Sequence, residues 1–235
     1  MKVKLIAYTP EPEKVCAASA MTSFKLEGSG AHIENLTKEE AHKIIRMVLG
    51  YGHHSVIEHA NFTFSIEEIS RACTHQLVRH RLASYTQQSQ RYVKIEDFDP
   101  VIPDSIKNNE KAKKIFDEMI DLIPVIYKKL ISLGIPPEDA RFILPNATKT
   151  NITVTMNARE LHHFFNLRCC ARAQWEIREL ATEMLRQVRK VAPVLFEGCG
   201  PSCVKLGYCP EGNLKPSSCD ITKIREKFER LGYEN

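Results

Sequence analysis

Residues 150–168 read Thr-Asn-Ile-Thr-Val-Thr-Met-Asn-Ala-Arg-Glu-Leu-His-His-Phe-Phe-Asn-Leu-Arg. The β-branched residues alternate over 150–156, which predicts a strand. Asn157 can cap the helix that follows, and that helix extends to the end of the stretch. On it, Arg159 and His163 are one turn apart and share a face. The chain therefore carries polar side chains at a point where a strand passes directly into a helix.

Similar patterns predict strands and helices along the rest of the chain. Thr37 and Glu40 form a capping box at the start of a helix that ends at Gly50. The other expected elements are strands at 2–8 and 61–66, a polar turn at 52–59, helices at 109–133, 171–192 and 220–231, and a helical turn at 136–141. This mixture belongs to the α/β (α+β) class.

The composition is that of an ordinary globular chain. Its 235 residues are 43% hydrophobic and carry a net charge of +4, which allows one large domain. That charge is too small to argue for a nucleic-acid or membrane surface. The first apolar run is too short for a signal peptide, and no stretch approaches the length of a transmembrane helix. We therefore expect a cytoplasmic protein.

A second informative stretch, residues 79–91, reads Arg-His-Arg-Leu-Ala-Ser-Tyr-Thr-Gln-Gln-Ser-Gln-Arg. Guanidinium groups stay charged and offer a fixed fork of donors to carboxylates and phosphates. Ser70 is expected to cap a helix that extends through Arg81. Three polar side chains would share one face of that helix: Gln76, Arg79 and His80.

Arginines also stand at two other junctions, at Arg141 and over 159–168. If the junctions meet in space, they form a pocket for phosphorylated ligands; otherwise residues 79–91 are a solvated basic patch. The chain has no P-loop and no Rossmann glycine motif, so side chains would have to hold any dinucleotide.

The eight cysteines leave several readings open. Cys169 and Cys170 lie inside an expected helix, which favours buried structural thiols over a catalytic nucleophile. Four cysteines of the turn-rich tail could form a structural zinc site, a redox-labile disulfide or free thiols: Cys199, Cys203, Cys209 and Cys219. We assign no metal site, because their spacing lacks paired Cys-x2-Cys knuckles.

Histidines gather in two places, at 53–59 and at 162–163. No His-Glu-x-x-His pair occurs, and histidines at junctions more often hydrogen-bond to backbone or ligand. We therefore do not expect a metal ion at either place.

Several of these motifs together resemble one family. Arg79-His80-Arg81, seven intervening residues and Ser89 are similar to the Arg-His-Arg-x7-Ser signature of the flavin-dependent thymidylate synthases. Further blocks match that family in order and spacing over roughly residues 1–200: Gly52-His53 through Glu58-His59, Asn157-Ala158-Arg159, Asn166-Leu167-Arg168 and Ala173-Gln174-Trp175-Glu176.

The resemblance implies a fold and an assembly. The fold would be a single domain over 1–198, with a central, mostly antiparallel sheet flanked by helices. A cysteine-rich C-terminal extension over 199–235 would pack on the same domain. The assembly would be a homotetramer whose active sites are shared between subunits, with no nucleic-acid or membrane partner.

The resemblance also implies an activity, the reductive methylation of dUMP to dTMP. The carbon donor would be 5,10-methylenetetrahydrofolate, and NADPH would supply the reducing equivalents. FAD would carry the hydride and the one-carbon unit. This transferase reaction belongs to dTMP biosynthesis.

The family's functional residues carry over to matching positions of this sequence. Those implied to bind dUMP are Gln76, Arg79, Gln87, Gln88, Ser89, Arg91, Arg141 and Arg168. Those implied to bind FAD are His53, Ser55, Glu58, Arg79, His80, Arg81, Gln87, Asn157, Arg159 and His163. Arg168 and Ser89 would be catalytic, with Arg168 against the uracil ring, where it favours the ionised N3.

The sequence departs from the family pattern at three positions. Thr86 and Gln87 replace the usual Asn and Glu, and His163 replaces an Asn. Gln87 can still donate and accept hydrogen bonds, but it brings no negative charge.

Two other functions are compatible with parts of the sequence. A nucleotide- and flavin-binding sensor would keep the pocket without turnover. A nucleic-acid-binding module would need aromatic residues along a continuous basic stripe, whereas here Trp175 is the only tryptophan and the arginines stand at separate junctions.

Overall fold

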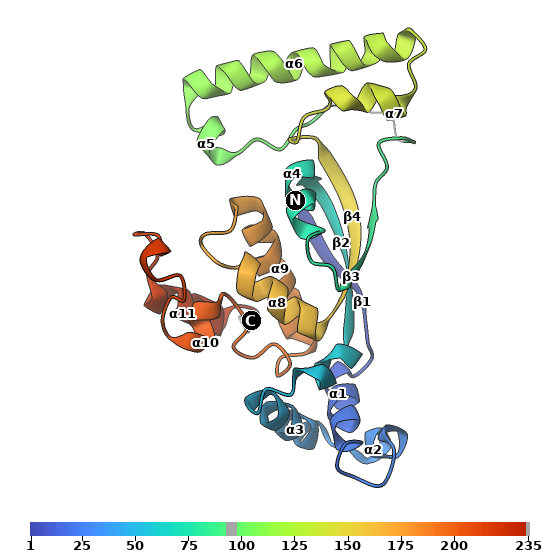
Figure 1. Cartoon of the computed structure of the whole chain (residues 1–235), viewed down its shortest axis with the longest axis vertical. Helices are drawn as coiled ribbons and strands as arrows, with labels where there is room; N and C mark the ends of the chain where they lie inside the picture. Colours follow the sequence, from blue (N-terminus) through green and yellow to red (C-terminus); the bar gives the residue numbers. More distant parts are fainter. Residues whose placement is uncertain (93–97, 234–235) are drawn as a thin grey trace. The chain divides into compact units, whose positions relative to one another are not determined.

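The computed structural model describes residues 1–92 and 98–233 (Figure 1). The strands are β1 (Lys2–Tyr8), β2 (Asn61–Ser70), β3 (Ala83–Gln87) and β4 (Lys149–Asn157). The α-helices are α1 (Pro12–Met21), α2 (Ser29–Asn35), α3 (Lys38–Gly50), α4 (Arg71–Leu77), α5 (Asp104–Lys107), α6 (Glu110–Ser132), α7 (Pro137–Ala140), α8 (Ala158–Arg168), α9 (Trp175–Val191), α10 (Ser202–Leu206) and α11 (Ile221–Arg230). Short 3-10 helices are η1 (His54–His59), η2 (Arg141–Ile143) and η3 (Gly212–Leu214).

The four strands form one antiparallel sheet in the order β1-β2-β4-β3, with helices around it. The chain divides into two compact units, which are described separately. Unit 1 contains residues 1–2, 66–78 and 86–152, and unit 2 contains residues 3–65, 79–85 and 153–235. The expected α/β (α+β) class, with an antiparallel sheet flanked by helices, is confirmed.

The core of unit 2 is formed by strand residues of β2 and β4 together with α8 and α9. Period-two burial on β2 and β4 places Phe62, Phe64 and Met156 inward. Phe165 on α8 and Phe196 after α9 are also fully buried, and the rings of Phe62 and Phe196 meet edge to face at 5.2 Å. Burial of each such ring contributes roughly 1.5–3 kcal/mol. The helix that carries the candidate polar residues is therefore firmly anchored.

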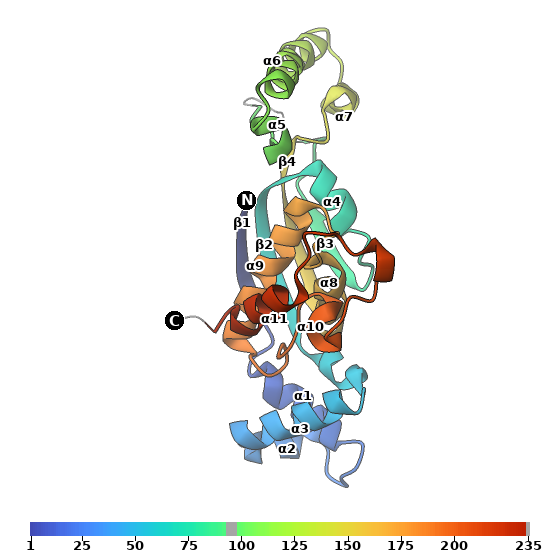
Figure 2. The ribbon, with the colours of Figure 1, turned by 90° about the vertical axis from the view of Figure 1, so that its left-hand side faces the viewer.

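One buried arginine fastens the C-terminal tail of unit 2. Arg189 on α9 is 1% exposed and donates hydrogen bonds to four backbone carbonyls, those of Phe196, Cys199, Phe228 and Leu231. Its guanidinium also lies over the ring of Tyr233 at 5.3 Å. A buried charge is tolerated when its donors are satisfied. Figure 2 shows α11 within the C-terminal tail, and the Phe228 carbonyl of α11 is one of those that Arg189 of α9 binds.

Unit 1 contains a helical subregion formed by α5, α6 and α7. Asn109 caps α6 by accepting from the Ala112 N–H at 3.1 Å, and the helix begins where the sequence predicts one. Within α6, only Ile123 and Tyr127 are buried. Pro124 lies inside this helix. In the described part of the chain, no helix is long and apolar enough to span a membrane.

Several sequence predictions are confirmed, and two helix boundaries are wrong. The capping box of Thr37 and Glu40 is present, and Ser70 and Asn157 cap the helices that follow them. The helix predicted through Arg81 ends at Leu77, so residues 76, 79 and 80 do not share a helical face.

The second correction concerns the region after α8. The helix predicted over 171–192 begins at Trp175, capped by the Gln174 side chain. Residues 169–174 form turns, so α8 and α9 are separate helices and Arg168 and Arg172 are not one helical turn apart. The strand β3 lies inside a stretch expected to be loop, and 52–59 contains the 3-10 helix η1 rather than a simple turn.

We predict that Arg189→Met strongly destabilises the fold. Methionine fills a similar volume but leaves four buried carbonyls without these donors, at a cost of about 1–3 kcal/mol for each unsatisfied group. We expect urea unfolding to show a loss of several kcal/mol. Arg46→Met is the control, because Arg46 forms an exposed ion pair with Glu197 whose loss should cost about 1 kcal/mol or less. Equal effects of the two substitutions would contradict this account.

Candidate functional site

In unit 1, two arginines implied to bind dUMP contact one acidic residue of α7, and a serine implied to bind dUMP contacts the backbone of one of them. The Arg91 Nε donates to the Glu138 carboxylate at 2.8 Å, and the Arg141 Nε donates to the Glu138 backbone carbonyl at 3.0 Å. The Ser89 hydroxyl accepts from the Arg91 N–H at 3.1 Å. The fold thus brings together a hydroxyl and two guanidinium groups, which is a donor set suited to a phosphate.

The polar side chains before Ser89 are anchored to a neighbouring helix and strand. The Gln87 amide donates to the Thr74 hydroxyl of α4 at 3.1 Å and to the Thr150 hydroxyl of β4 at 3.4 Å. The Gln88 N–H donates to the Asn151 carbonyl at 2.9 Å, and its side chain is exposed. Gln76 is half-buried on α4. An amide at position 87 can donate to both hydroxyls, which a carboxylate could not do.

In unit 2, the Arg-His-Arg motif lies between the end of α4 and β3, and its three side chains have different environments. Arg79 and Arg81 are exposed and make no ion pair within the described residues, whereas His80 is only 4% exposed. The Tyr85 hydroxyl donates to the His80 carbonyl at 2.8 Å and fixes the turn. The motif therefore offers two cations to solvent and one imidazole to the core.

The His80 ring links two residues of α8. Its Nδ1 lies 3.2 Å from the Glu160 Oε1, and its Nε2 accepts from the Arg168 Nε–H at 3.1 Å. The ring packs edge to face against Phe164 at 4.9 Å and against His163 at 5.6 Å. Burial, helped by the nearby Arg168 charge, lowers the pKa of His80 to about 4. The contact with Glu160 is therefore a hydrogen bond of a neutral ring and not an ion pair.

The residues implied to bind FAD come from η1, the Arg-His-Arg motif and α8. Arg159 on α8 forms an ion pair with Glu58 on η1, and both side chains are about half exposed. Asn157 uses its side chain to cap α8 by accepting from the Glu160 N–H at 2.9 Å. His53 and Ser55 are exposed at η1, where His53 meets the Tyr51 ring edge-on. Gln87, which is also implied to bind FAD, belongs to unit 1.

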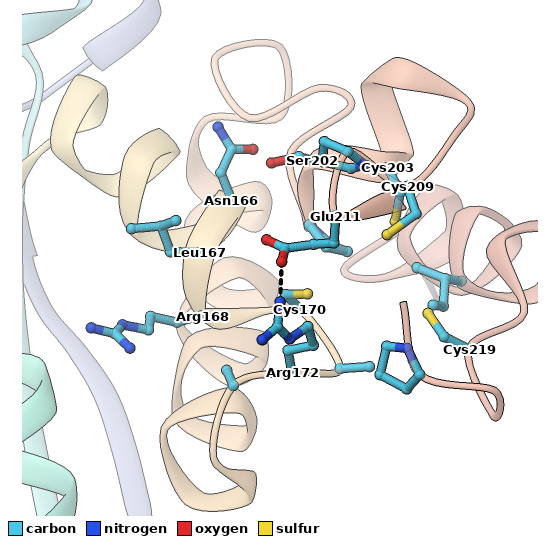
Figure 3. Close-up of a pocket in the computed structure, with 16 residues that line it drawn as sticks. Asn166, Leu167, Arg168, Cys170, Arg172, Ser202, Cys203, Cys209, Glu211 and Cys219 are labelled. Carbon is cyan, nitrogen blue, oxygen red and sulfur yellow. Dashed lines mark hydrogen bonds and ion pairs between the residues drawn. The ribbon is translucent and has the colours of Figure 1, made fainter. Parts of the chain in front are cut away.

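Three of the four tail cysteines line one cavity together with Cys170. Four thiols line a cavity of about 390 Å³ in unit 2, and these are Cys170, Cys203, Cys209 and Cys219 (Figure 3). Cys199 does not line it and is buried elsewhere, with its carbonyl bonded to Arg189. Cys170 is half-buried, so its assignment as a buried thiol is wrong, whereas Cys169 is buried as predicted.

Figure 3 shows how the other side chains of this cavity point. The Arg172 guanidinium pairs with Glu211, and the Arg168 side chain points away from the thiols. No group of three or more histidine, cysteine, aspartate or glutamate residues within 1–92 and 98–233 is arranged to hold a metal ion. The tetrad Cys199, Cys203, Cys209 and Cys219 considered for zinc is therefore not assembled.

The structure adds residues that sequence motifs did not single out. Glu160 is 5% exposed beneath His80, and Glu138 joins the two arginines of unit 1. The sequence offered one indication that Glu160 matters. It is the third residue after the cap Asn157 and lies one turn before the exposed His163. Nothing local marked Glu138 as different from other acidic residues in a first helical turn.

The chain matches a known family over most of its length. Residues 4–194 match the model of the family described as thymidylate synthase complementing protein. The chain belongs to this family. A flavin-dependent thymidylate synthase of Pyrococcus furiosus is 48% identical over 98% of both chains. One from Geobacter sulfurreducens is 50% identical over 91% of this chain and 93% of the relative. The predicted family is therefore confirmed.

A solved structure shows the same fold in a more distant protein. The UMP/dUMP methylase PolB of Streptomyces cacaoi, bound with 5-Br dUMP, superimposes with a TM-score of 0.70. The match covers 83% of this chain and 93% of the methylase, at 23% identity. The sheet and its helices thus form a fold that this chain shares with a protein of low sequence identity.

We predict a specific proton uptake from the second buried imidazole, His162. Burial lowers the pKa of His162 to about 4, and its Nε2–H donates to the Leu195 carbonyl at 2.7 Å. Because the unfolded ring titrates near 6.5, stability is complete above that pH and falls as the pH drops toward 4. In urea unfolding near pH 5.5, the wild type should take up about one proton more than His162→Gln. Equal uptake in both proteins would contradict the assignment.

Proposed function

We propose that this chain converts dUMP to dTMP by reductive methylation, with FAD as cofactor, 5,10-methylenetetrahydrofolate as carbon donor and NADPH as reductant. Membership of the family supports the reaction. The observation that carries the proposal is the Arg168 guanidinium, held by a buried neutral His80 inside the Arg-His-Arg motif. The remaining residues of the predicted sites supply phosphate-binding and orienting groups.

The chemistry of the unit 2 residues fits FAD. Arg79 and Arg81 present guanidinium groups without carboxylate partners among the described residues, which suits a pyrophosphate. Arg159 is held beside η1 by Glu58 and adds a third cation. His53, Ser55, Asn157, His163 and the amide of Gln87 complete the proposed set. His80, which the family resemblance also implies for FAD, is left out of it because its buried ring is bonded to Glu160 and Arg168. When bound, the flavin would supply hydride and one-carbon transfer, while these residues bind and orient it.

The chemistry of the unit 1 residues fits the nucleotide. Ser89, Arg91 and Arg141 would hold the dUMP phosphate, with further contacts from Gln76, Gln87, Gln88 and from Arg79 of unit 2. The Arg91–Glu138 pair is about half exposed, and such pairs contribute about 0–1 kcal/mol. A phosphate can therefore replace or share this carboxylate at little cost.

Methylation requires the uracil C5 to become nucleophilic, and the buried thiols are poorly suited to form an adduct. Burial raises the pKa of Cys16 and of Cys169 to about 12 and that of Cys199 to about 11. Burial also raises the pKa of Cys203 and Cys219, and neighbouring thiols add to this effect. The thiolate, which is the reactive form, is thus disfavoured at five positions.

Ionisation of the uracil ring is the alternative route, and Arg168 would provide it. A guanidinium about 4 Å from an N3 anion contributes roughly 4 kcal/mol at an effective dielectric near 20, or about three pK units. That is enough to populate the anion near neutral pH and to increase electron density at C5. Ser89 would keep the nucleotide in place while this occurs.

The assembly and the domain boundaries form part of the same proposal. We propose a homotetramer with shared active sites, a domain over 1–198 and an extension over 199–235 packed on it. The described part of that extension belongs to unit 2, where Arg189 and the cysteine-lined cavity connect it to the helices. A cytoplasmic location stays a prediction.

The competing function is a nucleotide and flavin sensor without turnover, and Thr86 and Gln87 are the residues that favour it. An activity assay distinguishes the two functions. It combines the purified protein with FAD, dUMP, methylenetetrahydrofolate and NADPH. We expect NADPH oxidation that depends on dUMP and yields dTMP in equal amount. If the protein binds FAD and dUMP but forms no dTMP, it is a sensor.

We predict that Arg168→Ala retains FAD and the fold but loses at least a hundredfold in dTMP formation. The reason is the loss of the charge that stabilises the N3 anion, roughly 3 kcal/mol or more. Flavin absorbance and single-turnover dTMP yield are the measurements. Arg172→Ala serves as control, because Arg172 pairs with Glu211 and should keep near-normal turnover. Near-normal dTMP formation by Arg168→Ala would exclude Arg168 as the activating group.

We predict that Ser89→Ala weakens dUMP binding by about tenfold to a hundredfold without loss of FAD, since one hydrogen bond to a charged group contributes about 1.5–3 kcal/mol. Titration of dUMP followed by flavin absorbance gives the dissociation constant. Thr9→Ala is the control and should leave dUMP binding unchanged, because the Thr9 hydroxyl accepts the Asn61 N–H and is not among the residues proposed to bind the nucleotide. Release of the flavin by Ser89→Ala would contradict the assignment of this serine to the nucleotide.

A further inference from the structure

We propose that Glu160 is a positioning residue for the reaction: its carboxyl group fixes the tautomer of His80, and that tautomer holds the Arg168 guanidinium in place. This inference rests on the proposed function, because it takes Arg168 as the group that faces the uracil ring. Glu160 itself touches neither flavin nor nucleotide in this account. Its effect passes through one buried imidazole.

The hydrogen-bond pattern determines which ring nitrogen carries the proton. The Arg168 Nε–H can only donate, so the His80 Nε2 at 3.1 Å must accept and cannot carry a hydrogen. The proton of the neutral ring is therefore on Nδ1, which lies 3.2 Å from the Glu160 Oε1 and donates to it. The other tautomer would place two N–H groups face to face at Arg168 and leave Nδ1 without a hydrogen for Glu160 to accept.

The surroundings keep the ring from adopting another orientation. His80 and Glu160 are 4% and 5% exposed, so water does not compete for either contact. Phe164 packs edge to face on the ring, and Tyr85 binds the His80 carbonyl from β3. Rotation of the imidazole would bury an unpaired nitrogen, which is costly in such a site.

Glu160 is held as firmly as the ring that it contacts. It lies in the first turn of α8, where the Asn157 side chain accepts its backbone N–H at 2.9 Å. Arg168 is the last residue of the same helix. One helix thus supplies both the acceptor that orients His80 and the guanidinium that His80 orients, so α8 and the Arg-His-Arg turn form a closed hydrogen-bonded unit.

The charge state of Glu160 is not essential to this role. Burial raises the pKa of its carboxyl group, while the nearby His163 opposes that shift. What His80 needs is an oxygen acceptor at Nδ1–H, and an amide oxygen supplies one as well. Glu160→Gln is therefore the conservative variant, and Glu160→Met removes the acceptor while keeping most of the volume.

The first experiment reads the tautomer without any ligand. Nitrogen-15 spectra of the ring in wild type and Glu160→Gln should show a protonated Nδ1 and an unprotonated Nε2 for His80. Glu160→Met should lose this single tautomer. A wild-type ring with its proton on Nε2 would overturn the proposal even if no variant folds.

The second experiment connects the tautomer to the reaction. The probe is 5-fluoro-dUMP, whose N3 ionisation is followed by fluorine-19 resonance in the FAD-loaded protein. In Glu160→Met we expect the pKa of bound N3 to rise by about one unit and kcat to fall about tenfold with little change in KM, as for one lost hydrogen bond. Glu160→Gln should restore both.

A matched control separates positioning from general destabilisation. Phe165→Leu removes packing on the same helix, against Phe164 and Phe196, without touching the His80 ring contacts to Glu160 and Arg168. It should lower stability and leave the His80 tautomer and the bound N3 pKa unchanged. If it shifts N3 as much as Glu160→Met does, the positioning role is wrong.

The two levels of the proposal fail differently. If Arg168→Ala leaves the N3 pKa of bound 5-fluoro-dUMP unchanged, the proposed function of Arg168 is wrong. If Arg168→Ala raises that pKa but Glu160→Met does not, Arg168 acts as proposed and Glu160 does not position it.

Discussion

A buried imidazole placed between a carboxyl group and a guanidinium can satisfy both neighbours only as a neutral ring with one particular nitrogen protonated. His80 is in this situation, between Glu160 and Arg168. A second proton on the ring would point at the Arg168 Nε–H, and burial already disfavours charge there. The site therefore depends on keeping protons off a histidine, and the aromatic packing of α8 provides the dry environment that does so.

This constraint explains how one short motif can serve two purposes. In Arg-His-Arg, the outer side chains are exposed cations and the central one is part of the core. Neighbouring residues in a turn point in different directions, so exposed arginines can face a phosphorylated ligand while the histidine orients a third arginine from α8. Because the buried thiols have raised pKa values, activation of the pyrimidine by charge is favoured over a covalent adduct.

Local patterns predicted the parts of the fold that local chemistry decides. Capping side chains at Thr37, Ser70, Asn109 and Asn157 start helices where expected, since a cap is satisfied within three residues of itself. Helix ends and short strands were less predictable. α4 stops at Leu77, before the arginines, and β3 forms because it pairs with β4, a partner far along the chain. A five-residue strand such as β3 is too short to show a clear alternation of apolar and polar residues in the sequence.

The candidate site also contains residues that the sequence predicts and residues that it does not. Motifs identified the arginines, Ser89 and the residues of η1 and α8, but long-range partners stayed invisible. Glu160 meets a ring 80 positions away, and Cys170 rather than Cys199 joins the tail thiols because the chain turns after α8. The network around His80 depends on three-dimensional packing, which spacing in a sequence does not encode.

The most direct test of the central claim is a crystal structure of the chain with FAD and dUMP bound. The account predicts the Arg168 guanidinium about 4 Å or less from the uracil N3, still bonded to the His80 Nε2, because only at that range does its charge shift the N3 pKa by several units. Arg168 more than about 8 Å from the ring, or a His80 side chain that binds the flavin instead of Glu160 and Arg168, would contradict it.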